Sequence, residues 1–271
     1  MSNPRAFSLD DPAIAPRIDG SPLALLLDID GTIAPITRAP KDAAVPAETQ
    51  RVMRELALQS DVTVAAVTGR SVDDGFRMVP IDEIWMIGNH GMEVRPPGGS
   101  SAGHEAARAY EPVLARAFAR VRALGEPIDG VVCGHKGWSL SLHYRQAERA
   151  HEAALLAGME AISAETGLRI LYGKQVVELR PPIDVHKGTA CVAVAEEVGA
   201  LSNGGSVLYA GDDRTDEDAF AFLRETKPDA ITIRVMTPGD APRETRAEFV
   251  LPSVQAMGEA LAAILARRQR V

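Results

Sequence analysis

Hydrophobic and polar residues follow one another along the first part of the chain in a pattern that predicts buried strands separated by helices. Unbroken apolar runs predict strands over residues 23–29, 61–70 and 84–87. Apolar residues at helical spacing predict a helix over residues 46–59, between the first two strands. Continuous apolar strands in a strand–helix–strand order are typical of a parallel sheet that helices cover on both faces.

The middle of the chain has a different pattern. Residues 96–103 are rich in proline, glycine and serine, and they predict a turn region where the chain leaves the first sheet. Helical spacing over residues 111–124 and 147–166 then alternates with two hairpin patterns, which turn around residues 134–137 and Gly173. This order predicts a small α+β unit inserted into the larger domain.

The alternation of helices and strands resumes at residue 184. The expected elements are a helix over residues 187–199 and strands over 206–210, 231–235 and 249–251. Capping signals at helix starts are Ser71 with Asp74, Thr215 with Asp218, and Ser253 before the terminal helix.

These patterns together predict the fold class and the domains. The class is α/β, a Rossmann-like doubly wound parallel-sheet core with an inserted α+β cap domain. We expect a loose N-terminal lead-in over residues 1–20, core over 21–108, cap over 109–182 and core again over 183–271.

Composition and charge narrow the class of protein. The chain has 271 residues, a formal net charge of −8 and 4% aromatic residues, so we expect a largely aliphatic core. The acidic balance argues against non-specific nucleic-acid binding and against docking on anionic membranes. No apolar run approaches the roughly 20 residues of a membrane span, and the first residues lack the pattern of a signal peptide. Two cysteines are too few for a disulfide framework, and we expect a cytoplasmic protein.

The first predicted strand ends in two acidic residues, Asp28 and Asp30, followed by Gly31 and Thr32. Residues two apart on a strand point the same way, and open α/β sheets place their ligands at the carboxyl ends of the strands. Two carboxylates aimed at one place repel each other unless a cation lies between them, and Mg²⁺ is a hard cation that suits them. The alternative interpretation is a strand that runs into an ordinary polar turn.

Further polar residues fall where the strands of one sheet should end. They are Thr68, Lys187, Asp212 and Asp213. A nucleophilic carboxylate needs a metal to hold a phosphate group, while a hydroxyl and an ammonium suit the phosphoryl oxygens. A second carboxylate can protonate the leaving oxygen and later activate water. The set suits phosphoryl transfer, although a turn or an exposed lysine at a helix start would explain single members of it.

These residues carry a resemblance to a known superfamily of enzymes. The four motifs of haloacid-dehalogenase-type phosphatases resemble four segments here: Asp28–Thr32, Thr68–Arg70, Lys187–Gly188 and Gly211–Phe220. The second segment has threonine where serine is commoner, with the same hydroxyl chemistry.

Three further segments resemble a narrower family, the trehalose-6-phosphate phosphatases. They are Gly88–Glu93, Lys136–Arg145 and Val177–Pro181. With the superfamily motifs, the resemblance spans residues 23–220. One departure concerns the stretch before Lys136, which often carries acidic residues in the family and here reads Cys133-Gly134-His135.

By position, the resemblance implies the catalytic groups. Asp28 would be the nucleophile that forms an aspartyl-phosphate, and Asp30 the general acid and base. Thr68 and Lys187 would bind the phosphoryl group.

The resemblance also implies a Mg²⁺ cofactor. Its ligands would be Asp28, the carbonyl of Asp30, and Asp212. Asp213 and Asp216 would orient the waters of the metal or the lysine rather than ligate directly.

In the family the cap closes over the site and reads the sugar. The substrate-binding residues that the resemblance implies are Gly69, Arg70, Asn89, His90, Lys136, His143, Arg145, Glu178 and Arg180. Carboxylates and cationic donors recognise the hydroxyls of a disaccharide. His143 also fits a structural histidine, Arg180 also fits a pair with a local carboxylate, and we expect Trp138 to pack within the cap.

The resemblance therefore implies a Mg²⁺-dependent hydrolase of trehalose 6-phosphate, and with it functional coupling to a trehalose-phosphate synthase. One alternative is a phosphatase for another sugar phosphate, such as sucrose phosphate or glucosylglycerol phosphate. A phosphomutase would share the aspartyl-phosphate. A catalytically silent sugar-phosphate sensor is a further alternative, against which the presence of both Asp28 and Asp30 argues.

Overall fold

The computed structural model describes residues 4–37, 42–173, 175–237 and 244–270. The chain divides into two compact units: a core unit of Met1–Ala102 and Val185–Val271, and an inserted unit of Gly103–Asp184. The units therefore meet after residues 102 and 184, whereas the sequence led us to expect junctions after residues 108 and 182.

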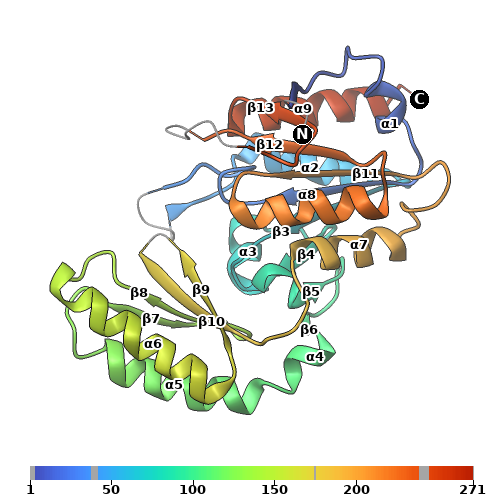
Figure 1. The fold of residues 1–271 in the computed structure, drawn as a ribbon. Helices are drawn as coiled ribbons and strands as arrows, with labels where there is room; N and C mark the ends of the chain where they lie inside the picture. Colours follow the sequence, from blue (N-terminus) through green and yellow to red (C-terminus); the bar gives the residue numbers. More distant parts are fainter. Residues whose placement is uncertain (1–3, 38–41, 174, 238–243, 271) are drawn as a thin grey trace. The chain divides into compact units, whose positions relative to one another are not determined.

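The core unit is built on one sheet (Figure 1), and β2 is the middle strand in its order. Among the described residues its strands are β1 (Arg5–Ala6), β2 (Leu23–Asp28), β3 (Val62–Val67), β4 (Trp85–Gly88), β5 (Glu93–Arg95), β6 (Ala102–Gly103), β11 (Ser206–Gly211), β12 (Ile231–Val235) and β13 (Phe249–Leu251). Their order is β1-β13-β12-β11-β2-β3-β4-β5-β6. In this order, all neighbouring strands from β1 across to β4 pair in parallel, and β5 runs antiparallel to β4. The predicted α/β fold with a parallel sheet is confirmed.

Alternate residues of β2 enter two separate hydrophobic clusters. Leu23, Leu25 and Leu27 pack on one face of the sheet, and Ala24 and Leu26 pack on the other, all fully buried. Each buried leucine contributes about 1.5–3 kcal/mol by leaving water. Burial on both faces explains why β2 is apolar up to Asp28, the last residue of the strand.

Helices cover both faces of the core sheet. The helices of this unit are α1 (Ala15–Ile18), α2 (Ala47–Ala57), α3 (Val72–Met78), α7 (Lys187–Glu197), α8 (Arg214–Thr226) and α9 (Val254–Arg268), with a 3₁₀ turn at Asn89–Gly91. Figure 1 shows α7 and α8 on one face and α2 and α9 on the other, which agrees with the two hydrophobic clusters.

The expectation of a loose N-terminal lead-in was wrong for residues 4–20, while residues 1–3 lie outside the described part. Strand β1 pairs with β13, and Ile14 and Ile18 are fully buried. The guanidinium of Arg17 donates to the Glu248 carboxylate at 2.8 Å. A strand of two residues and a helix of four are too short to show a period in the sequence, so tertiary contacts hold this segment.

One capping prediction was also wrong. The predicted pair of Thr215 and Asp218 does not open α8; instead Asp213 accepts from the N–H of Asp216, and Asp216 accepts from the N–H of Asp213. Ser253 caps α9 as predicted, accepting from the N–H of Ala256. Five of the seven residues from 212 to 218 are acidic, so the sequence alone did not select the pair.

The inserted unit is an antiparallel sheet backed by two helices. Its strands, in the order β7-β8-β10-β9, are β7 (Val132–His135), β8 (Leu140–His143), β10 (Val176–Arg180) and β9 (Arg169–Gly173). Its helices are α4 (Glu105–Arg108), α5 (Glu111–Gly125) and α6 (Glu152–Thr166), with a 3₁₀ turn at Arg149–His151. Leu140 and Leu142 of β8, and Val177 and Leu179 of β10, pack on α5 and α6. Because side chains alternate along a strand, Ser141, His143, Glu178 and Arg180 share the opposite face.

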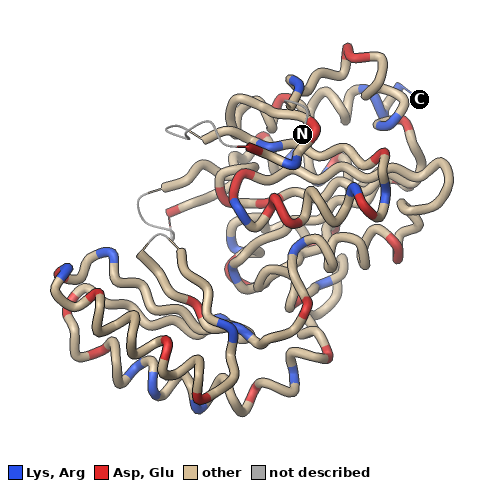
Figure 2. Tube along the Cα trace, viewed as in Figure 1, with Lys and Arg blue, Asp and Glu red and all other residues tan. Residues whose placement is uncertain are grey.

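Charged residues of both signs are interspersed along both units (Figure 2). This distribution accompanies the net charge of −8. Within the described residues, every helix is too short or too polar to cross a bilayer.

Candidate active site

The expected catalytic residues of the core unit lie at one edge of its sheet. Asp28 ends β2, Thr68 directly follows β3, and Asp212 directly follows β11. All three are buried, at 4%, 1% and 8% exposure. Because β2 lies between β3 and β11, the topology places these side chains at the carboxyl end of three neighbouring parallel strands.

Lys187 places its ammonium between two buried carboxylates. It begins α7, where His186 and Thr189 form a capping box. Nζ donates to Oδ1 of Asp28 and to Oδ1 of Asp216, each at 2.7 Å. Burial by itself lowers the pKa of Lys187, but the charges of Asp216 and Asp28 outweigh it and hold the pKa well above its ordinary value. Lys187 is therefore a fixed cation beside Asp28.

Asp216 is fully buried and accepts four hydrogen bonds. Oδ1 accepts from Lys187 at 2.7 Å and from the hydroxyl of Tyr209 at 2.6 Å. Oδ2 accepts from the backbone N–H groups of Asp212 and Asp213, each at 3.0 Å. A carboxylate has about four lone-pair sites, and these donors take them up. Asp216 therefore orients Lys187 and the turn that carries Asp212.

A metal ion would find a suitable set of ligands here. Carboxylate oxygens of Asp28, Asp212 and Asp216 lie within 4.8 Å of one another. Since Asp216 is already engaged by four donors, Asp28 and Asp212 are the better ligands. Burial, which Lys187 only partly offsets, and the neighbouring carboxylates raise the pKa of Asp28 well above its ordinary value. A bound cation would compensate this excess of negative charge.

Gly31 makes room for Asp212 beside the backbone of the first motif. Its φ is +84°, and a Cβ at this position would lie 2.1 Å from Oδ2 of Asp212. Only glycine accommodates both the positive φ and this approach. The Asp212 carboxylate therefore lies against the chain next to the Asp30 carbonyl, a third oxygen of the kind that hard cations prefer.

Asp30 is engaged by Arg70, which the sequence had predicted to bind substrate. The guanidinium donates from Nε to Oδ2 at 2.8 Å and from a terminal nitrogen to Oδ1 at 2.7 Å. The hydrogen bonds from Arg70 to Asp30 raise the pKa of the guanidinium. Both oxygens of the expected general acid and base are thus held by one cation.

The loop after β3 connects Thr68 with the residues that follow β4. The hydroxyl of Thr68 accepts from the N–H of Arg70 at 3.0 Å. Asn89 and His90 have φ of 49° and 56°, and their N–H groups donate to the carbonyls of Arg70 and Thr68. The imidazole of His90 lies against Gly69. The structure thus brings together the five predicted residues of this region.

The expected sugar-recognition residues of the inserted unit form an ionic cluster on its sheet. Nζ of Lys136 donates to Oε1 of Glu178 at 2.8 Å, and Nε of Arg180 donates to Oε2 at 3.1 Å. His143 and Arg145 are exposed at the end of β8 and just beyond it. The pairing of Arg180 with Glu178 agrees with the alternative that it binds a local carboxylate.

Two residues that contact the site were not assigned a role from the sequence. Thr32 is fully buried, and its hydroxyl donates to Oδ2 of Asp28 at 3.2 Å. Tyr209 contacts Asp216, as described above. Thr32 belongs to the first motif and could have been found there, whereas Tyr209 stands in an apolar strand with no polar pattern around it.

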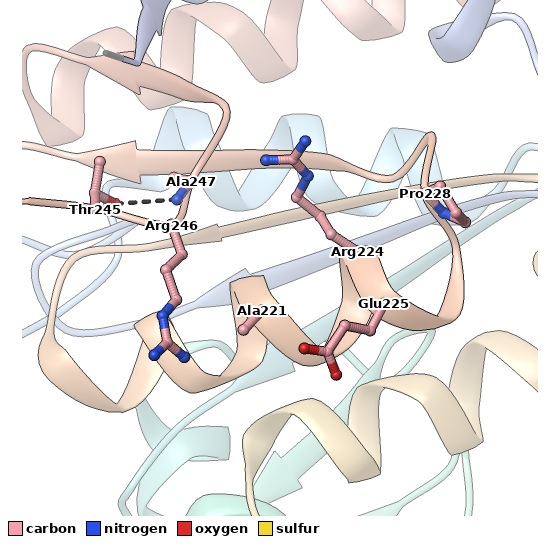
Figure 3. A pocket seen from close by; sticks show the side chains of 7 residues that line it. All are labelled: Ala221, Arg224, Glu225, Pro228, Thr245, Arg246 and Ala247. Carbon is pink, nitrogen blue, oxygen red and sulfur yellow. Dashed lines mark hydrogen bonds between the residues drawn. The ribbon is translucent and has the colours of Figure 1, made fainter. Parts of the chain in front are cut away.

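A hollow of about 490 Å³ elsewhere on the core unit does not involve the expected site residues (Figure 3). It lies beside α8 and is lined by Ala221, Arg224, Glu225, Pro228, Thr245, Arg246 and Ala247. The side chains of Arg224 and Arg246 point in different directions, so they do not converge on one ligand (Figure 3).

Comparisons with known proteins agree with the motifs. The sequence profile of the trehalose-phosphatase family matches residues 26–255. A trehalose-phosphate phosphatase of Mycolicibacterium paratuberculosis is 36% identical over 231 residues, which cover 85% of this chain and 59% of that protein. The enzyme of that name from Mycobacterium tuberculosis H37Rv is 33% identical over 240 residues, covering 87% and 59%. The chain thus spans about 59% of the length of these relatives.

A solved structure of a trehalose-6-phosphate phosphatase related protein superposes with a TM-score of 0.76 and 28% identity, over 91% of this chain and 99% of that one. The segment that the family profile matches includes β2 from Leu26, the loop of Arg70, Lys187 and the Asp212–Asp216 turn. On these grounds the chain belongs to the trehalose-phosphatase family.

Proposed function

We propose that this protein is a Mg²⁺-dependent phosphatase that hydrolyses trehalose 6-phosphate to trehalose and phosphate. The observation that carries the proposal is the buried contact between Lys187 and Asp28, at the sheet edge that also holds Thr68 and Asp212. Family membership and the names of the relatives support the choice of substrate.

In this proposal Asp28 is the nucleophile. Its carboxylate attacks phosphorus, the bond from phosphorus to the sugar oxygen breaks, and the phosphoryl group stays on Asp28 as an aspartyl-phosphate. Lys187 and Thr68 bind the phosphoryl oxygens as negative charge spreads over them. Asp30 gives a proton to the departing sugar oxygen, then takes one from the water that attacks phosphorus and restores Asp28.

The residues that would hold Mg²⁺ are Asp28, Asp212 and the carbonyl of Asp30. When bound, the ion neutralises charge on the phosphate. Asp213 and Asp216 would not bind the ion themselves but would orient the groups around it. Asp216 does so through its hydrogen bonds to the turn that carries Asp212.

Arg70 adds a step that the motifs do not imply. Proton transfer requires a carboxylate oxygen of Asp30 that can reach the substrate, and in this structure the guanidinium of Arg70 donates to both oxygens. Guanidinium groups also bind phosphate through two nitrogens. A phosphate that engages Arg70 would therefore release Asp30 for proton transfer.

We assign sugar recognition to the inserted unit, a cap domain in this proposal. Its residues for this role are Lys136, His143, Arg145, Glu178 and Arg180. The Lys136–Glu178–Arg180 cluster offers both donors and acceptors, which the hydroxyls of a disaccharide require. Gly69, Asn89 and His90 of the core unit complete the substrate-binding set. Coupling to a trehalose-phosphate synthase and a cytoplasmic location stay predictions from the sequence.

The test is phosphate release from a panel of sugar phosphates, with Mg²⁺ and with a chelator. Trehalose 6-phosphate should lead the panel by about a hundredfold, a difference of about 2.7 kcal/mol. The matched control is Asp28→Asn, which removes the nucleophile at nearly constant volume and should abolish release without unfolding the chain. Equal release from sucrose phosphate would contradict the substrate, and an active Asp28→Asn variant would contradict the mechanism.

A further inference from the structure

Tyr209 is a buried polar residue that the proposed chemistry does not use. It lies in β11 and is fully buried. Its ring packs edge to face on Phe220, with centroids 5.6 Å apart and planes at 75°. With the ring in this position, the hydroxyl donates to Oδ1 of Asp216 at 2.6 Å.

The oxygen that Tyr209 contacts is the one that also holds Lys187. Oδ1 of Asp216 accepts from the ammonium at 2.7 Å. The same ammonium donates to Oδ1 of Asp28 at 2.7 Å. The position of Lys187 therefore depends on how strongly each of two carboxylates attracts it. A neutral donor on Oδ1 of Asp216 weakens the attraction of that carboxylate and leaves Lys187 shared with Asp28.

The second oxygen of Asp216 connects Tyr209 with the turn after β11. Oδ2 accepts from the N–H groups of Asp212 and Asp213 at 3.0 Å. A Cβ on Gly211 would lie 2.3 Å from Cγ of Asp216, so the carboxylate lies close against Gly211. With both oxygens engaged, the carboxylate cannot turn without breaking contacts to Lys187 or to the turn.

We propose that Tyr209 is a positioning residue for phosphoryl transfer, and that its hydroxyl, acting through Asp216, sets the place of Lys187 beside Asp28. The inference rests on the proposed phosphatase function and concerns the reaction step rather than sugar binding. Loss of the hydroxyl should draw Lys187 toward Asp216 and leave a buried acceptor with one donor fewer.

The variant that tests this is Tyr209→Phe, which removes the hydroxyl and keeps the ring. We expect kcat to fall about ten- to thirtyfold, while KM changes by less than about threefold. The control is Tyr172→Phe, in which the lost hydroxyl donates to Glu160 at 2.7 Å on the exposed surface of the inserted unit. Its kcat should equal that of the wild type.

A packing control separates position from stability. Phe220→Leu removes the ring that packs on Tyr209 but keeps the tyrosine hydroxyl. It should lower the melting temperature, while kcat falls less than in Tyr209→Phe. If Phe220→Leu loses as much kcat as Tyr209→Phe at an equal loss of stability, the hydroxyl has no separate role and the inference is overturned.

A double-mutant cycle tests the route through Asp216. In an Asp216→Asn background, which alters the acceptor, Tyr209→Phe should change the residual kcat by less than about twofold. The same ten- to thirtyfold loss in both backgrounds would show that Tyr209 acts independently of Asp216, against the inference. Absence of phosphatase activity in the wild-type chain would overturn the proposed function as well, whereas an active wild type with an unaffected Tyr209→Phe overturns this inference alone.

Discussion

Replacing Lys187 by methionine should destabilise the core unit, because two buried carboxylates would lose the cation between them. Asp28 and Asp216 each lie 2.7 Å from Nζ, and the lysine side chain is 3% exposed. Removing one partner of a buried ion pair typically costs about 3–5 kcal/mol. Methionine nearly matches the volume of the lysine stem, so the loss is electrostatic rather than the result of a cavity.

The assay is thermal unfolding at neutral pH with a chelator present, since a bound divalent ion would compensate the two buried carboxylates that have lost the lysine. At roughly 2–4 °C for each kcal/mol in a chain of this size, Lys187→Met should lower the melting temperature by about 10 °C. A matched control is Lys227→Met, whose ammonium pairs at 3.5 Å with an exposed Asp229. A surface pair of this kind is worth about 1 kcal/mol or less.

A second variant isolates the charge balance. Adding Asp216→Asn to Lys187→Met removes one of the two uncompensated carboxylates, so the double variant should unfold at a higher temperature than Lys187→Met alone. If Lys187→Met and the wild type unfold at the same temperature in the presence of the chelator, the two carboxylates do not need the lysine for stability. That result would refute the electrostatic reasoning for this site.

Three further predictions concern other contacts. Arg70→Ala should raise KM for a sugar phosphate and for an aryl phosphate by similar factors, because it removes a guanidinium that binds phosphate and leaves Asp30 free for proton transfer; a loss confined to kcat for the sugar phosphate would contradict this role. Glu178→Ala should raise KM for trehalose 6-phosphate far more than for an aryl phosphate, which steady-state kinetics on both substrates would check. Burial alone would raise the pKa of Glu248, but Arg17 and Arg5 hold it below its ordinary value. Its contribution to stability is then present above about pH 4.5 and is lost as the pH falls through the lower folded pKa. Urea midpoints between pH 6 and pH 3 should therefore fall less steeply in Glu248→Gln than in the wild type.

The core of the fold could be predicted because its strands are buried on both faces. A strand such as β2 packs Leu25 on one side and Leu26 on the other, so it must be apolar throughout, and the sequence shows this directly. The helices α2 and α5 were predicted for the related reason that one face of each is apolar. The first motif stood out because two acids end an otherwise apolar run.

Short elements escaped prediction for the opposite reason. Strand β1 has two exposed residues and β5 has three half-buried ones, so neither forms an apolar run, whereas the equally short β13 is apolar and was predicted. The cap of α8 was assigned to Thr215 and Asp218 because several acidic residues follow one another there. Which of them turns toward the N–H groups is decided by Asp216, whose carboxylate lies in the buried site.

By itself, the sequence determined which residue types are present at the strand ends, and with them the chemistry that this edge of the sheet can perform. Tertiary structure alone decided which of these residues meet. Lys187 is 159 positions from Asp28, Arg70 is 40 from Asp30, and Tyr209 reaches Asp216 from inside an apolar strand. Contacts over such separations follow from the order of strands in the sheet and from burial of the groups together, and neither leaves a local pattern in the chain.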